Sequence, residues 1–158
     1  MKIHRKKTLL FHDRLFFQLV IILVYFLSSC SSISYSSSPS TYTPDPKRSG
    51  YELLNYAEQY RNLSSVMNRK YLEQDIESIQ NLLIEALEIP ETVKNLEVSN
   101  AYLNAKEYVL NWMWSDAYWF TLIAYDGTTD EMSKAFDDST KYLTLFLDEM
   151  LRLGHDLD

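Results

Sequence analysis

Residues able to perform catalytic or metal chemistry are scarce beyond the first 30 positions. His4 and His12 precede the single cysteine, Cys30, so His155 is the one imidazole of the remaining chain. A Ser-His-Asp triad would need its base on that C-terminal tail, which we expect to fray. Cys or His clusters, Glu-x-x-His pairs and Gly-rich phosphate loops are absent from the sequence. These residues therefore predict a non-enzymatic protein with no metal and no cofactor.

Asp116 stands out because it interrupts the most apolar stretch of the chain, residues 108–125. At helical spacing it shares one face with Trp112 and Trp119. The structural interpretation is a half-buried carboxylate that pairs with a Lys, an Arg or a Tyr hydroxyl inside a core. The functional interpretation makes Trp112, Asp116 and Trp119 a ligand pocket between helices. The sequence leaves both interpretations open.

Acidic residues also gather near the start of the last helical segment. They are Asp126, Asp130, Glu131, Asp137 and Asp138. Their carboxylates have the chemistry of calcium ligands, but the spacing does not match an EF-hand loop. We interpret them as acids that complement the dipole at a helix start.

The first 29 residues have the three parts of an export signal. A basic region, 1–14, is followed by a 13-residue apolar run, 15–27, and then by Ser28 and Ser29. A permanent membrane span needs about 20 apolar residues, so this run is short for one. The pattern predicts a signal peptide over residues 1–29.

Leu27-Ser28-Ser29-Cys30 resembles the lipobox of bacterial lipoproteins, an aliphatic residue and two small residues before a Cys. The resemblance covers only residues 1–30. It implies that Cys30 receives a diacylglycerol, that the signal is cleaved just before it, and that the new N-terminus is acylated, with palmitate as a typical chain. Two or three acyl chains anchor a protein stably. The alternatives are an uncleaved N-terminal membrane helix and an ordinary cleaved signal.

The basic leader predicts that everything after Cys30 lies on the extracytoplasmic side of the membrane. Ser31 is not the Asp that retains many lipoproteins at an inner membrane, so the resemblance favours the outer membrane in a two-membrane cell. In a one-membrane cell the domain would face the wall. The localisation expected is therefore the bacterial cell membrane or outer membrane, reached through the lipid.

Twelve of the sixteen residues 31–46 are Ser, Thr or Pro. Such a segment buries too little apolar surface to offset the entropy of ordering, so residues 30–46 are predicted to be a lipidated Cys and a disordered tether. Without the leader's five basic and one acidic residues, totals of 15 and 22 become 10 and 21, a net charge of about −11. This acidic body argues against a nucleic-acid partner.

From Ser49 onward, apolar residues recur every three or four positions, as in amphipathic helices. The first stripe is Leu53, Tyr56, Tyr60, Leu63 and Met67, and the second is Leu72, Ile76, Ile79, Leu83 and Ala86 or Leu87. The step of five from Met67 to Leu72 predicts either a kink or a helix boundary at Asn68-Arg69. Pro90 is expected to end this run and to start a third helix.

The third segment, residues 90–125, is apolar nearly all round in its second half, which is typical of a buried central helix. Asp126-Gly127 predicts a turn, Thr128 and Glu131 a capping box, and Gly154 the end of the last helix. Together these signals predict an all-α fold over residues 47–158. It is an up-down bundle of three long helices, or of four if the chain breaks near Asn68-Arg69, with the aromatic segment between the first pair and the last helix.

Two functions fit this organisation. The first is a lipid-anchored lipoprotein of the cell envelope that displays a helical domain to another envelope protein. The second is a small-ligand binding protein that uses the aromatic pocket around Asp116.

Overall fold

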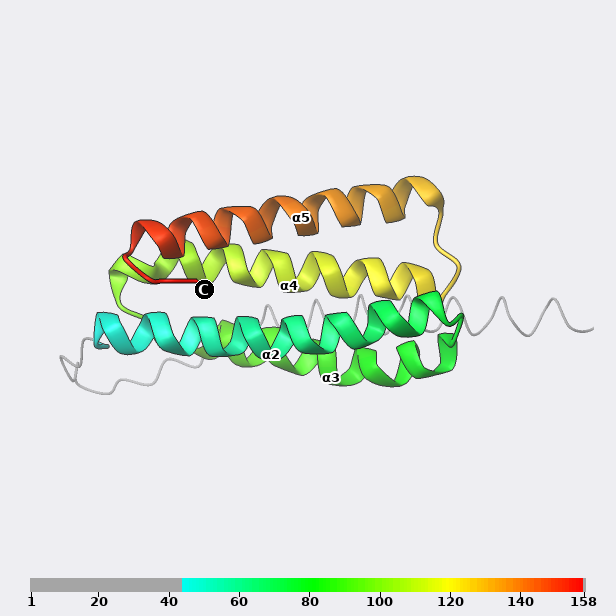
Figure 1. Cartoon of the computed structure of the whole chain (residues 1–158), viewed down its shortest axis with the longest axis horizontal. Helices are drawn as coiled ribbons and strands as arrows, with labels where there is room; N and C mark the ends of the chain where they lie inside the picture. The colour runs from blue at the N-terminus through cyan, green and yellow to red at the C-terminus, as the bar shows by residue number, and fades with distance from the viewer. Residues whose placement is uncertain (1–43, 158) are drawn as a thin grey trace, which may run out of the picture. The chain divides into compact units, whose positions relative to one another are not determined.

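Four α-helices form the bundle in residues 44–157, the part of the chain that the computed structural model describes. The helices are α2 (Pro46–Leu72), α3 (Ile76–Asn95), α4 (Leu103–Ala124) and α5 (Thr129–Arg152), with a 3₁₀ turn η1 (Asn100–Tyr102) before α4. Successive helices run in opposite directions (Figure 1). The predicted all-α bundle is confirmed in its four-helix form. The signal peptide, Cys30 and the tether up to residue 43 lie outside the described residues.

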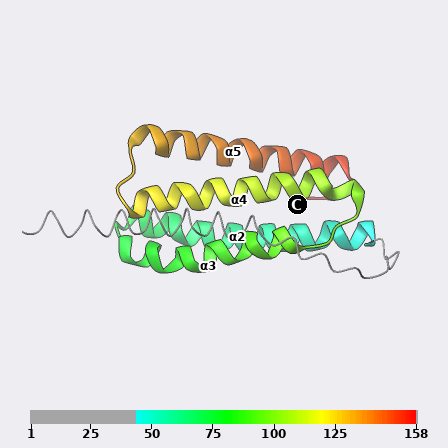
Figure 2. The ribbon, with the colours of Figure 1, turned by 180° about the vertical axis from the view of Figure 1, so that it is seen from behind.

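α4 is the central helix of the bundle. It lies between the α2–α3 pair and α5 and packs against all three of these helices (Figure 2). This is the arrangement that its apolar sequence predicts, because a helix without a polar face must be covered on every side. No helix within residues 44–157 has the length and apolarity needed to cross a membrane.

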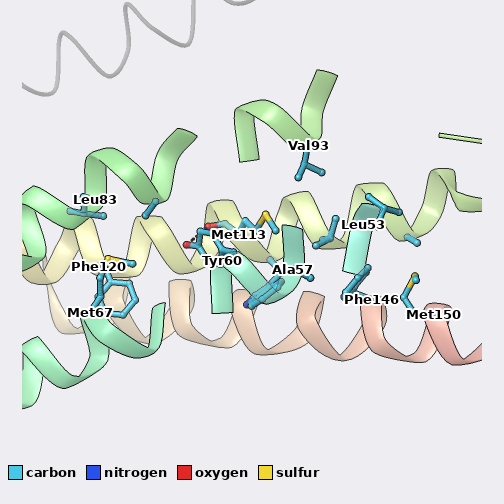
Figure 3. Packing of buried hydrophobic residues seen from close by; sticks show 14 of the residues in the cluster. Leu53, Ala57, Tyr60, Met67, Leu83, Val93, Met113, Phe120, Phe146 and Met150 are labelled. Atoms are coloured by element: carbon cyan, nitrogen blue, oxygen red, sulfur yellow. Dashed lines mark hydrogen bonds between the residues drawn. The ribbon is translucent and has the colours of Figure 1, made fainter. Parts of the chain in front are cut away.

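The core consists of one stripe from each outer helix, packed against α4 (Figure 3). α2 contributes Leu53, Ala57, Tyr60 and Met67, α3 contributes Ile79, Leu83, Ala86, Pro90 and Val93, and α5 contributes Ala135, Phe146 and Met150. The spacing of three and four residues keeps each stripe on one side of its helix. Each large side chain buried in this way stabilises the fold by about 1.5–3 kcal/mol.

The break between the first two helices is real, but it lies at residues 73–75 and not at Asn68-Arg69. The stripe loses phase because Met67 is the last core residue of α2, and the helix continues for one more turn to the exposed Leu72. Gln74 then adopts φ of 59°, and the Gln74 and Asp75 amides donate to the carbonyls of Tyr71 and Lys70. This is a Schellman ending, which the sequence hides because its left-handed residue is neither Gly nor Asn.

Pro90 does not start a helix, as the sequence had suggested, but lies buried inside α3. A proline has no amide hydrogen, so the carbonyl one turn earlier lacks its helical donor. The position nevertheless belongs to the buried stripe between Ala86 and Val93. Packing against the core offsets the lost hydrogen bond, and α3 continues to Asn95. α4 therefore begins thirteen residues after Pro90, at Leu103.

The predicted signals around α5 are confirmed. The Thr128 hydroxyl accepts from the Glu131 amide, and the Glu131 carboxylate accepts from the Thr128 amide, which completes the capping box. At the other end, Gly154 has φ of 84° and follows the last turn of the helix. Gly127 lies so close to Leu122 that any side chain at this position would clash with it, which explains the glycine in this turn.

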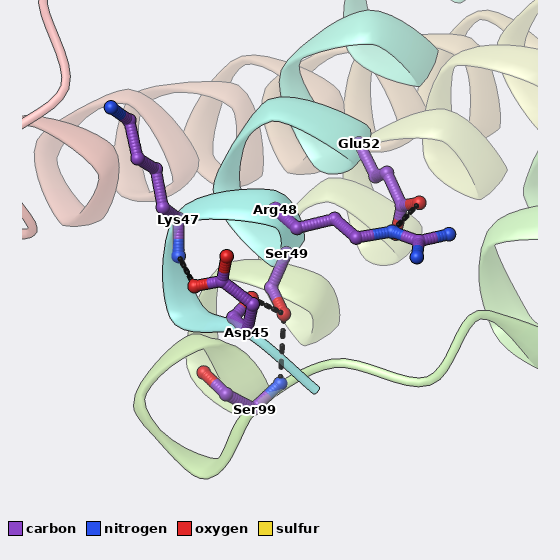
Figure 4. A network of polar contacts seen from close by, with 6 residues as sticks. All are labelled: Asp45, Lys47, Arg48, Ser49, Glu52 and Ser99. Atoms are coloured by element: carbon purple, nitrogen blue, oxygen red, sulfur yellow. Dashed lines mark hydrogen bonds and ion pairs between the residues drawn. The ribbon is translucent and has the colours of Figure 1, made fainter. Parts of the chain in front are cut away.

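Polar contacts connect the start of α2 to the α3–α4 connection (Figure 4). Asp45 caps the helix by accepting from the Lys47 amide at 3.0 Å. The buried Ser49 hydroxyl donates to the Asp45 carbonyl and accepts from the Ser99 amide, each at 3.0 Å. With Asp45 as the cap, Pro46 occupies the first helical position, where a missing amide hydrogen costs nothing. α2 thus begins one residue before the predicted start of the helical domain.

The left-handed conformation of Gln74 generates a prediction. An L-residue with a side chain pays about 1 kcal/mol or more for this conformation, and glycine does not. We expect Gln74→Gly to raise the free energy of unfolding by about 0.5–1 kcal/mol in urea denaturation. The matched control is Gln59→Gly in the middle of α2, which should lower it by about 0.5 kcal/mol. A loss of stability in Gln74→Gly would contradict this reading of the turn.

Candidate functional site

α4 presents the three predicted pocket residues along one side, at positions i, i+4 and i+7. Each of the three side chains has different neighbouring residues. Trp112 is next to Tyr60 of α2, with ring centroids 5.4 Å apart, and Asp116 is next to Ser139 of α5. Trp119 contacts Tyr71 of α2 and Phe136 of α5. The structure therefore brings the three residues onto the side of α4 that contacts both α2 and α5.

Trp112 is a core residue, with 4% of its surface exposed. Its ring meets that of Tyr60 edge to face, a favourable geometry for aromatic pairs. The hydroxyl of Tyr60 donates to the main-chain carbonyl of Met113 at 2.8 Å, which satisfies the buried polar atom (Figure 3). This part of the side is packed against protein.

The Asp116 carboxyl lies between α4 and α5 and is only partly satisfied. Oδ1 accepts from the Ser139 hydroxyl at 3.3 Å, while Oδ2 is buried without a hydrogen-bond partner. Among the described residues, no Lys or Arg forms an ion pair with it. The hydrogen-bond partner is thus Ser139, while the Tyr60 hydroxyl, a group of the kind that the structural interpretation named, lies near enough to lower the pKa of the carboxyl. A buried acceptor without a donor is costly, so this carboxyl is the least satisfied polar group on α4.

Burial raises the pKa of Asp116, because the charged form loses its hydration. The hydroxyl groups of Ser64, Ser139 and Tyr60 act in the opposite direction. The pKa of Tyr60 is raised well above its ordinary value, first by its own burial and then by the negative charge of Asp116. The acid is therefore held in a site that favours its protonated form.

Trp119 is half-buried and reaches the surface within a row of aromatic rings. Its ring lies 5.9 Å from Tyr71, 4.7 Å from Phe120 and 5.7 Å from Phe136, centroid to centroid. Phe120 is buried, whereas Tyr71 and Phe136 expose 44% and 53% of their surface. Tyr71, Trp119 and Phe136, which we call the aromatic surface cluster, therefore join the core to an exposed apolar surface.

Three surface hollows of the described residues lie elsewhere on the bundle. Two of them, of about 450 and 300 Å³, flank the start of α2 around Arg48 and Glu52. The third, of about 570 Å³, lies between α2 and α3 and is the largest. The sequence did not point to it, because Tyr56 and Leu63 look like ordinary members of the core stripe. Only the pairing of α2 with α3 shows that these side chains also line an open groove.

His155 does not lie on a frayed tail, contrary to the expectation from its position. Its Nε2 is 2.7 Å from the Tyr102 hydroxyl, with which it shares a hydrogen bond, and its ring meets Tyr51 edge to face. A Cβ at Gly50 would overlap the imidazole, so the glycine leaves room for it. The ring attaches the end of the chain to the start of α2. It has a structural role there.

Within residues 44–157, no three His, Cys, Asp or Glu side chains are grouped in a way that would hold a metal ion. No protein-family model, no curated protein and no solved structure matches the chain. The geometry of the described residues is therefore the basis for assigning a function.

The raised pKa of Asp116 predicts how stability depends on pH. The folded state keeps the proton to higher pH than the unfolded chain, so the stability from this group is complete below about pH 4 and is lost as the pH rises through the folded-state pKa. An amide does not titrate. We therefore expect the wild type to lose stability relative to Asp116→Asn as the pH rises above about 4 and through the folded-state pKa of Asp116.

Urea denaturation at a series of pH values measures this difference. Asp137→Asn on the exposed surface of α5 is the matched control, since its carboxylate is in contact with water. Its stability should follow the wild-type curve at a constant offset. If the free energy of unfolding of the wild type instead rose relative to that of Asp116→Asn as the pH increased, the charged form of Asp116 would be the stabilising one.

Burial also separates the two tryptophans. Trp112→Ala should lower the free energy of unfolding by about 3–5 kcal/mol, as large-to-small changes in a core do. Trp119→Ala should cost about 1–3 kcal/mol, because part of its ring already faces water. Tyr118→Ala, a half-exposed aromatic control on the same helix, should stay within about 1 kcal/mol of the wild type. Equal costs for both tryptophans would contradict this difference in burial.

Proposed function

We propose that this protein is a non-enzymatic lipoprotein of the bacterial cell envelope. In this proposal Cys30 carries the lipid, residues 31–43 form the tether, and the helical bundle is held on the extracytoplasmic side to bind another envelope protein. The observation that carries the proposal is Leu27-Ser28-Ser29-Cys30 at the end of the apolar run. That position is where a lipobox must lie for the signal to be cleaved before the Cys.

The bundle suits display because its core is formed by its own four helices. Large apolar side chains nevertheless remain exposed. They include Leu72 at 81%, Ile84 at 67% and Phe136 at 53%. Of these, Phe136 lies next to Trp119, which also contacts Tyr71, so these rings share one exposed apolar surface of the kind that is typical of an interaction site. The chain enters the bundle at the start of α2, and the aromatic surface cluster lies near the other end of this helix, about 40 Å away. A partner bound to the aromatic surface cluster would thus lie far from the start of α2, where the proposed tether ends.

A second candidate is the binding of a small ligand around Asp116. It is favoured by one specific observation, the buried Oδ2 without a hydrogen-bond partner. A ligand that carries a hydrogen-bond donor would satisfy this oxygen, with Trp112 and Trp119 on either side along α4. Reaching it would require α5 to move, because Ser139 of that helix covers the carboxyl.

The anchor is tested by metabolic labelling with palmitate. We expect the wild-type chain to incorporate the label and Cys30→Ala to lose it completely, because the thioether can form only at this sulfur. The variant should accumulate as an uncleaved precursor or be released from the membrane fraction. Ser32→Ala, two residues beyond the motif, is the control and should label normally. Full labelling of Cys30→Ala would overturn the lipid anchor.

A further inference from the structure

We propose that the hollow between α2 and α3 is a docking groove for a basic amphipathic helix of a partner protein. This α2–α3 groove is lined by four apolar residues, Tyr56, Leu63, Val66 and Ile89, which we call its apolar floor, by the acidic residues Glu85 and Glu88, and by the neutral polar residues Gln59, Asn62 and Thr92. The inference names the kind of partner for the interaction role proposed above and rests on that role. It does not depend on the lipid.

The shape follows from the pairing of two antiparallel helices. Residues 56–66 of α2 face residues 85–92 of α3 across the groove. On α3 the lining positions recur every three or four residues, so they form one continuous stripe. Ten residues of helix extend over about 15 Å, which is nearly three turns of a docked helix. A groove with apolar lining between two helices can receive the apolar side of an amphipathic helix.

The floor is apolar although it meets solvent. Tyr56, Leu63 and Ile89 are half-buried, and Val66 exposes 36% of its surface. Covering these atoms removes apolar surface from water and favours association. The groove therefore accepts the apolar side of a partner helix.

The negative charge of the groove favours basic residues on the polar side of the partner helix. Glu85 and Glu88 are its only charged lining residues, and neither forms an ion pair among residues 44–157. Two unpaired carboxylates beside an apolar floor complement a helix that is flanked by Lys or Arg. The net charge of about −11 after Cys30 attracts such a partner from a distance.

The test uses the full chain in phosphatidylcholine nanodiscs and a synthetic 18-residue helix of Leu and Lys with a photoreactive group. We expect saturable crosslinks to residues 56–66 and 85–92, mapped by mass spectrometry. The same peptide with Glu in place of Lys should give none. In Glu85→Gln/Glu88→Gln the half-saturating peptide concentration should rise about threefold to tenfold, the effect of losing two ion pairs at a surface.

Asp137→Asn/Asp148→Asn on α5 is the matched control, because it removes the same charge from an exposed surface outside the groove. Its half-saturating concentration should equal that of the wild type. An equal loss in this control, or crosslinks spread over all helices, would show a general attraction to an acidic protein and overturn the site. Crosslinks between two copies of the chain through the groove would assign it to a homodimer and overturn it too.

The assay is repeated with Cys30→Ala to separate this inference from the lipid anchor. Peptide crosslinking should persist in that variant, since the groove lies wholly within α2 and α3. Loss of palmitate labelling with peptide binding retained supports both proposals. Palmitate labelling that survives in Cys30→Ala overturns the anchor alone, and absent peptide binding to a labelled wild type overturns the groove alone.

Discussion

The burial of α4 is the constraint on which the rest of the fold depends. This helix has apolar residues on nearly its whole circumference, and a single neighbour cannot cover it. The α2–α3 pair covers one side and α5 covers the other. α3 continues through Pro90 because the buried stripe continues past it, and the packing outweighs the missing hydrogen bond. The loops that connect the helices begin shortly after the last buried residue of each helix, as after Met67 of α2 and Val93 of α3.

The same burial creates the unusual environment of Asp116. A carboxyl on a helix that is covered on both sides loses much of its contact with water, and the bundle supplies the Ser139 hydroxyl instead of a basic side chain. The raised pKa and the unpartnered Oδ2 are two consequences of this one fact. Asp116 is thus a polar group that the core tolerates at a cost.

The exposed surface divides into two regions of different chemistry. The aromatic surface cluster joins α2, α4 and α5 through Trp119, so its rings depend on the core for their positions. The α2–α3 groove is formed by two helices alone and combines an apolar floor with unpaired carboxylates. With the lipid anchor proposed above, both regions would be available to hold a partner close to the membrane. The groove has the more selective chemistry, because charge adds orientation to apolar contact.

The sequence by itself determined the helical class, the central position of the aromatic helix and the capping box at Thr128. These follow from local periodicity and from hydrogen bonds between near neighbours in the chain. It also marked Trp112, Asp116 and Trp119 as one side of a helix. Only the tertiary structure decided that Gln74 ends α2, that Pro90 stays helical, that Ser139 is the partner of Asp116, and that α2 and α3 enclose a groove. Each of these depends on atoms far apart in the sequence or on a conformation that packing imposes against local preference, and such terms leave no periodic signal in one chain.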